Sequence, residues 1–79
     1  MKSKEKKTYY KDAELLVQIG ENLRKVRESK GISQESLAND FGLDYTQINR
    51  MELGKVNFSI SNLYRLAKAL GVDAKKLLP

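Results

Sequence analysis

Residues 33–55 read SQESLANDFGLDYTQINRMELGK, and this stretch decides the fold. Two helical patterns occupy it, over residues 34–41 and 45–53, and only the segment 42–44 separates them. Two helices joined by so short a turn cannot lie antiparallel along their full length, so they must cross steeply, as in a helix-turn-helix. Gly42 can take the backbone conformation that such a turn requires.

The apolar residues of this stretch fit a steep crossing. We expect the following side chains to pack between the two helices: Leu37, Ala38, Phe41, Leu43, Ile48 and Met51. Ala38 is small enough to let the helix over residues 45–53 approach the helix over residues 34–41. Apart from Leu53, the remaining side chains of the helix over residues 45–53 carry polar groups, and their purpose is the question that the sequence raises.

Helical spacing of apolar residues continues along the chain and predicts an all-α fold of five helices. A first helix from Asp12 to Lys30 carries its apolar stripe at Leu16, Ile19, Leu23 and Val26, and Arg27 is expected to lie off that stripe. A fourth helix places Ile60, Leu63, Leu66, Ala67 and Leu70 in the core. The fifth helix is only a turn or two long.

Glycines and capping residues mark the ends of these helices. Each apolar segment is followed by a glycine, namely Gly31, Gly42, Gly54 and Gly71, and each glycine is soon followed by an expected N-cap, namely Ser33, Asp44, Ser59 and Asp73. Gly20 is the exception, because it lies inside the first helix, where it costs roughly 1 kcal/mol relative to alanine. Close approach of another helix would explain a glycine there.

Composition excludes several classes of function. The 79 residues make one small domain, and they include no cysteine and no histidine. There is consequently no thiol nucleophile, no imidazole base and no zinc site of the usual ligand types. No apolar run is long enough for a membrane span or a signal peptide. We therefore expect a cytoplasmic protein that is not an enzyme, without metal, cofactor or small-molecule ligand.

Positive charge is concentrated at the N-terminus. The net charge is +5, and residues 1–11 hold five lysines and one glutamate, so residues 12–79 keep ten basic and nine acidic side chains. We interpret 1–11 as a flexible basic arm and 12–79 as the folded domain. Lys4, Lys6 and Lys7 of the arm either wrap around a DNA duplex or belong to a tail that only aids solubility.

The quoted stretch, together with FSISNLYRLAKALGVDAKKLL at 58–78, resembles the phage repressor and Cro type of helix-turn-helix protein, also called XRE-like or lambda repressor-like. The resemblance covers residues 16–78. It implies a DNA-binding transcriptional regulator that docks its third helix, 45–53, in the major groove while the second helix crosses the backbone above it.

The resemblance also assigns roles to single residues. Base reading is implied for the exposed side chains of the third helix: Tyr45, Thr46, Gln47, Asn49 and Arg50. Arg50 would pair with guanine, Gln47 or Asn49 with adenine, and the Thr46 methyl with a thymine methyl. Gln34 looks like the family glutamine that holds a phosphate and braces the recognition helix, although an ordinary exposed first-turn residue is the alternative.

Several of these residues have a second interpretation. Asp44 and Gln47 are spaced as a capping box, in which Gln47 folds back on the helix start; for Asp44 the cap is the better interpretation. Arg50 either reads a base, binds a phosphate, or pairs with Glu52 or Asp40. Tyr45 either meets a base or stacks on the DNA backbone.

The loop after the third helix departs from the family pattern. Many relatives have Glu-Asn-Gly-Lys here, whereas this chain has Leu53 in place of the asparagine and Val56 in place of a basic residue. Backbone contacts are left to Lys55, Asn57 and Ser59. One domain alone would then bind DNA modestly, which makes a second subunit more important.

We therefore expect a homodimer that binds a two-fold-symmetric operator on double-stranded DNA. The residues predicted for its interface are Tyr64, Val72, Leu77 and Leu78, with core as the alternative for Leu77. The chain is most similar to small repressors and restriction-modification controllers. A protein–protein interaction module, such as an antitoxin or adaptor, is the alternative function.

Overall fold

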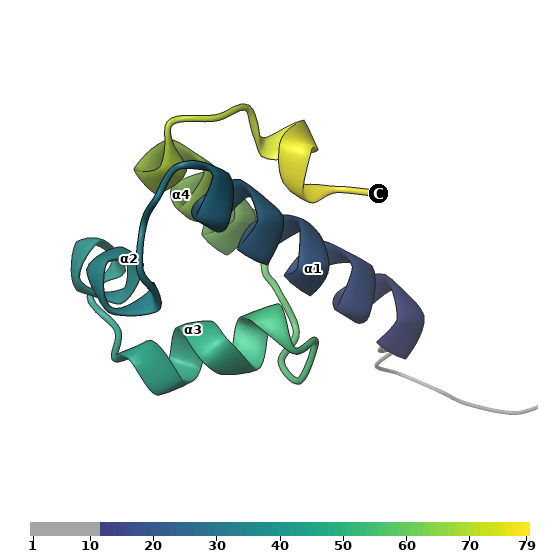
Figure 1. The fold of residues 1–79 in the computed structure, drawn as a ribbon. Helices are drawn as coiled ribbons and strands as arrows, with labels where there is room; N and C mark the ends of the chain where they lie inside the picture. Colours follow the sequence, from purple (N-terminus) through teal and green to yellow (C-terminus); the bar gives the residue numbers. More distant parts are fainter. Residues whose placement is uncertain (1–11) are drawn as a thin grey trace, which may run out of the picture.

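The computed structural model describes residues 12–79 (Figure 1). The predicted arm, with Lys4, Lys6 and Lys7, lies outside them. Within the described part the fold is all-helical, as predicted, but it has four α-helices where five helices were expected. The elements are α1 (Ala13–Ser29), α2 (Gln34–Phe41), α3 (Tyr45–Glu52), α4 (Ile60–Leu70) and a 3-10 helix, η2 (Ala74–Leu77).

The predicted capping residues determine where these helices begin. The side chains of Ser33, Asp44, Ser59 and Asp73 each accept a hydrogen bond from a first-turn backbone N–H, and Asp12 does the same for α1. Left-handed glycines end α2 and α4, at Gly42 and Gly71. The short fifth element forms a 3-10 turn, since only four residues separate its cap from Leu78.

The core lies where α1, α2, α3 and α4 meet, and η2 closes one end of it (Figure 1). Leu23, Leu37, Ile48, Leu66 and Leu77 are the largest fully buried side chains, and burying one leucine contributes roughly 1.5–3 kcal/mol. Val26 and Leu43 pack at its edge. No helix among residues 12–79 has the length and apolar character that crossing a bilayer requires.

One predicted core residue is exposed. Ile60 keeps 71% of its surface accessible at the first position of α4, whereas Leu63 and Leu66, further along the same helix, are buried. The expectation that Ile60 belongs to the core was therefore wrong. Helical spacing places Ile60 near the apolar stripe of α4 but does not show where the neighbouring helices end.

Close approach of another helix explains Gly20, as expected. A Cβ atom added at this position would lie 2.5 Å from the carbonyl oxygen of Glu52 and 2.6 Å from that of Met51. The C-terminal end of α3 thus rests directly on the backbone of α1. This contact fixes the end of α3 in space, so it bears on the polar face that α3 exposes.

Candidate nucleic-acid interface

The turn between α2 and α3 is held from both sides. Gly42 has φ 76°, and the backbone N–H of Leu43 donates to the carbonyl of Ala38 at 2.9 Å. On the α3 side, the Asp44 side chain accepts from the backbone N–H of Gln47 at 3.2 Å. The crossing of α2 and α3 is consequently defined by local hydrogen bonds as well as by the core.

Gln47 takes part in this cap. Its Oε1 accepts from the backbone N–H of Asp44 at 3.1 Å, which completes a capping box. The capping interpretation is therefore confirmed for both residues. The side chain of Gln47 nevertheless stays exposed, and its Nε2 makes no hydrogen bond to residues 12–79. Capping and a single donated hydrogen bond to DNA are compatible for this residue.

α3 exposes Tyr45 and Thr46 in its first turn and Arg50 in its last turn. Tyr45 is 54% exposed. Within residues 12–79, Arg50 forms no ion pair with Glu52 or Asp40, the two partners that the sequence offered as an alternative. Its guanidinium is thus available to a ligand on the solvent side of α3.

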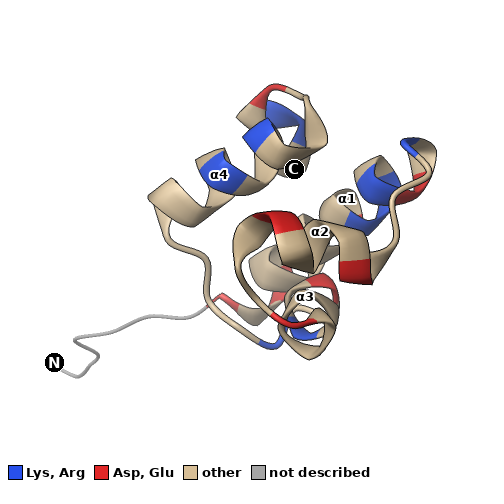
Figure 2. Ribbon diagram, turned by 90° about the vertical axis from the view of Figure 1, so that its left-hand side faces the viewer, with Lys and Arg blue, Asp and Glu red and all other residues tan. Residues whose placement is uncertain are grey.

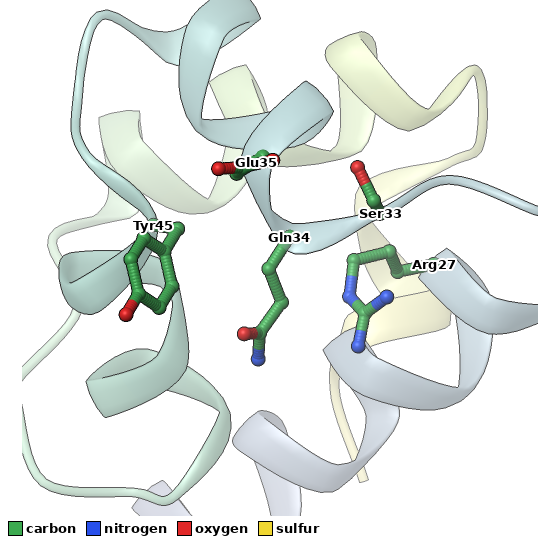
Figure 3. Close-up of a pocket in the computed structure, with 5 residues that line it drawn as sticks. All are labelled: Arg27, Ser33, Gln34, Glu35 and Tyr45. Atoms are coloured by element: carbon green, nitrogen blue, oxygen red, sulfur yellow. The ribbon is translucent and has the colours of Figure 1, made fainter.

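Gln34 braces α3 from the start of α2. Its Nε2 donates to Oδ1 of Asn49 at 3.2 Å and to Oε1 of Glu52 at 2.9 Å. Figure 3 shows Gln34 between Tyr45 and Arg27, in a hollow that Ser33 and Glu35 also line. Both amide hydrogens of Gln34 are used, so a phosphate at this point would be held by first-turn backbone N–H groups of α2.

A buried ion pair lies beneath this brace. The guanidinium of Arg27 donates to both carboxylate oxygens of Glu52, with 3.1 Å between Nη2 and Oε1, and Nη1 donates to the carbonyl of Ile32 at 2.8 Å. Arg27 and Glu52 are 9% and 6% exposed. The hydrogen bond to Glu52 raises the pKa of Arg27 above its usual value.

The expectation that Arg27 lies off the apolar stripe of α1 was wrong, because its side chain is buried. It follows Leu23 by four residues, and Glu52 follows Ile48 by four, so each charge continues an apolar stripe by one helical turn. Opposite charges at such positions on two helices are the signal that could have revealed the pair. The pair ties α1, α3 and the α1–α2 loop together.

The loop after α3 presents the residues proposed for backbone contacts. Lys55, Asn57 and Ser59 are exposed, and the backbone N–H of Lys55 donates to the carbonyl of Arg50 at 2.9 Å. Ser59 also caps α4, because its Oγ accepts from the backbone N–H of Asn62. Figure 2 shows that basic residues are sparse on α3 and this loop, so the surface is not strongly basic.

An apolar surface lies on α4 and the C-terminal residues. Tyr64 is 65% exposed and Leu78 45%, and both border the exposed Ile60. Val72 is partly buried. Leu77 is fully buried against the core, so the alternative that the sequence left open for it holds, and its side chain is not available to a partner.

Comparison with known proteins agrees with this geometry. A family model described as helix-turn-helix matches residues 23–77, which include the α2–α3 crossing, α4 and the second part of α1. The chain belongs to this helix-turn-helix family, of the XRE and Cro/C1 type. The family consists of DNA-binding regulators and is not an enzyme family.

Similar proteins include restriction-modification controllers. The chain is 43% identical over 61 residues to the control protein C.BamHI of Bacillus amyloliquefaciens, covering 76% of this chain and 75% of that protein. The crystal structure of the controller protein C.AhdI from Aeromonas hydrophila superposes with a TM-score of 0.80 and 38% identity, over 87% of this chain and 100% of that one.

A hypothetical transcription factor of Neisseria meningitidis is 40% identical over 67 residues. These residues are 85% of this chain, which thus spans 63% of the length of that relative.

Proposed function

We propose that this helix-turn-helix regulator binds a specific sequence in double-stranded DNA by inserting the N-terminal part of α3 into the major groove. The observation that carries the proposal is that α3 exposes Tyr45 and Thr46 in its first turn and Arg50 in its last, while Ile48 and Met51 pack its opposite face into the core. A major groove admits one α-helix, and its base edges match these side chains. Arg50 is assigned to guanine and the Thr46 methyl to a thymine methyl.

Backbone contacts position α3 in the groove. Lys55, Asn57 and Ser59 would meet phosphates on one side, and the first turn of α2, beginning at Gln34, would meet them on the other. Such contacts carry no sequence information, but they determine the register of α3. Regulation follows from occupancy of a promoter and needs no catalysis. This role requires a location in the cytoplasm, in contact with the cell's DNA.

The operator is read by a homodimer in this proposal. One domain covers little DNA, whereas a two-fold dimer reads two half-sites about one helical turn, roughly 34 Å, apart. The apolar surface of Ile60, Tyr64 and Leu78 supplies the contact between subunits, with Val72 at its border. Ile60 replaces Leu77 in the interface that the sequence predicted.

A protein–protein interaction module is the alternative function. It is favoured by Leu53, which ends α3 with 52% of its surface exposed beside the groove-facing residues. The near-neutral charge of residues 12–79 also fits a protein partner as well as it fits DNA.

Selection from a random duplex library separates the two functions. The DNA-binding proposal expects a two-fold-symmetric motif whose affinity falls as salt rises. Recovery of no motif at low salt would refute it and support the protein-binding module.

A further inference from the structure

A chain of hydrogen bonds runs from the interior of the domain to the recognition helix. Arg27 donates to Glu52, Glu52 accepts from Gln34, and Gln34 donates to Asn49. Three helices contribute, since Arg27 is on α1, Gln34 begins α2, and Glu52 and Asn49 are on α3. Of these four hydrogen-bonded residues, Asn49 is the one on α3 that is partly exposed. It is also one of the residues assigned to DNA.

The chemistry of the groups determines the direction of every bond in this chain. A guanidinium has only donors, and an ionised carboxylate has only acceptors. The atom of Gln34 that lies 2.9 Å from Oε1 of Glu52 must therefore be the amide nitrogen. That same nitrogen lies 3.2 Å from Asn49, so the Asn49 atom that faces it must be the carbonyl oxygen, Oδ1.

We infer that Asn49 meets DNA through its Nδ2 donor, in an orientation that Gln34 imposes. The inference rests on the proposed function. Nδ2 of Asn49 makes no hydrogen bond to residues 12–79, so both of its hydrogens remain for a ligand. The ligand group is then an acceptor, either on a base edge or on a phosphate.

This orientation changes the base expected at Asn49. Bidentate pairing with adenine needs Oδ1 to accept from N6, but Oδ1 is turned toward Gln34 and has only one lone pair left beside that bond, whereas Nδ2 keeps both hydrogens. Guanine offers two acceptors, O6 and N7, whereas adenine would leave its N6 donor unpaired. A base contact by Asn49 consequently favours guanine over adenine by about tenfold.

Substitution Asn49→Asp tests the inference with almost no change of shape. The aspartate can still accept from Gln34, but its second oxygen turns a donor into an acceptor. If Asn49 contacts a base, the selected motif changes at one position per half-site from guanine to cytosine or adenine, which offer amino donors. If it contacts a phosphate, the motif stays the same and affinity falls by at least about tenfold, through repulsion.

Two control variants make these outcomes interpretable. Asn39→Asp places the same charge on the exposed surface of α2 and measures its general effect on affinity. Gln34→Leu removes the brace and frees Oδ1, so adenine should become acceptable at a base position that Asn49 reads. Circular dichroism confirms that each variant is folded.

Two results would overturn the inference while leaving the proposed function intact. One is a wild-type motif with adenine at the position that Asn49→Ala loses. The other is an Asn49→Asp variant whose motif and affinity match those of Asn39→Asp. A wild-type chain that returns no motif refutes the proposed function instead, and this proposal with it.

Side-chain amide exchange provides a test without DNA. By NMR, the Nε2 hydrogens of Gln34 should exchange slowly with solvent and the Nδ2 hydrogens of Asn49 rapidly. Slow exchange at Asn49 with rapid exchange at Gln34 would mean that the amides have the opposite orientation, and it would overturn the inference whatever the DNA experiments show.

Discussion

Replacing Gly20 with alanine sets two physical effects against each other. In a helix interior, alanine is favoured over glycine by about 1 kcal/mol, so helix propensity alone predicts a more stable protein. The structure predicts the reverse, because the new Cβ would lie 2.5 Å and 2.6 Å from two backbone carbonyl oxygens of α3. Ordinary contacts at such a Cβ begin near 3.4 Å.

The size of the loss in stability depends on which atoms the new Cβ would contact. They belong to the backbone of Met51 and Glu52 and cannot rotate away, so the end of α3 must move by almost 1 Å. Overpacking of this kind costs about 1–3 kcal/mol, and contact with three backbone atoms below 3.0 Å places Gly20→Ala at the upper end. After the gain in propensity, we expect a net loss of about 2 kcal/mol.

Urea unfolding followed by circular dichroism measures this loss. With a slope near 1 kcal/mol per molar urea, the midpoint should fall by about 2 M at a fixed protein concentration. The exposed Gln18 on α1 provides the control, since Gln18→Ala and Gln18→Gly compare the same two residues without a neighbour and should differ by about 1 kcal/mol in favour of alanine. A Gly20→Ala variant more stable than wild type would refute the close packing of α1 and α3.

Four further predictions concern the ion pair, the cap, the interface and the arm. Arg27→Met should lower the free energy of unfolding by about 3–5 kcal/mol, because it leaves the buried charge of Glu52 without an opposite charge, and adding Glu52→Leu should restore much of it in a double-mutant cycle. Asp44→Ala should cost about 1 kcal/mol in urea unfolding through loss of the α3 cap. Tyr64→Glu should yield a folded monomer in sedimentation, and an unchanged dimer would exclude this surface. Deleting residues 1–8 should reduce the slope of log affinity against log salt by about 0.9 per phosphate that the arm neutralises, and an unchanged slope would mean that the arm does not bind DNA.

The features that could be predicted from the sequence are local ones. The bounds of α2, Gln34 to Phe41, agree with the prediction because a serine cap and a glycine stop lie directly at its ends. The capping box of Asp44 and Gln47 followed from their spacing alone. In each case the interacting groups are only a few residues apart, so no knowledge of the packing is needed.

Specific hydrogen bonds between distant segments escaped prediction, although the close approach of another helix at Gly20 was expected. Arg27 and Glu52 pair across 25 residues, and although each continues the apolar stripe of its own helix, neither helix alone shows which charge it meets. The bond from Gln34 to Asn49 depends on the crossing angle of α2 and α3, which the sequence indicates only as steep. Ile60 was misplaced for the same reason, since its exposure depends on where the neighbouring helices end.

The central claim is that α3 reads DNA sequence, and Arg50 tests it most directly. Library selection with Arg50→Ala should return the wild-type motif with definition lost at one guanine in each half-site. Arg24→Ala removes the same charge from an exposed position on α1 and should leave the motif unchanged. The account would be contradicted if Arg50→Ala returned the full wild-type motif, or if both variants lost affinity equally with no change at any base.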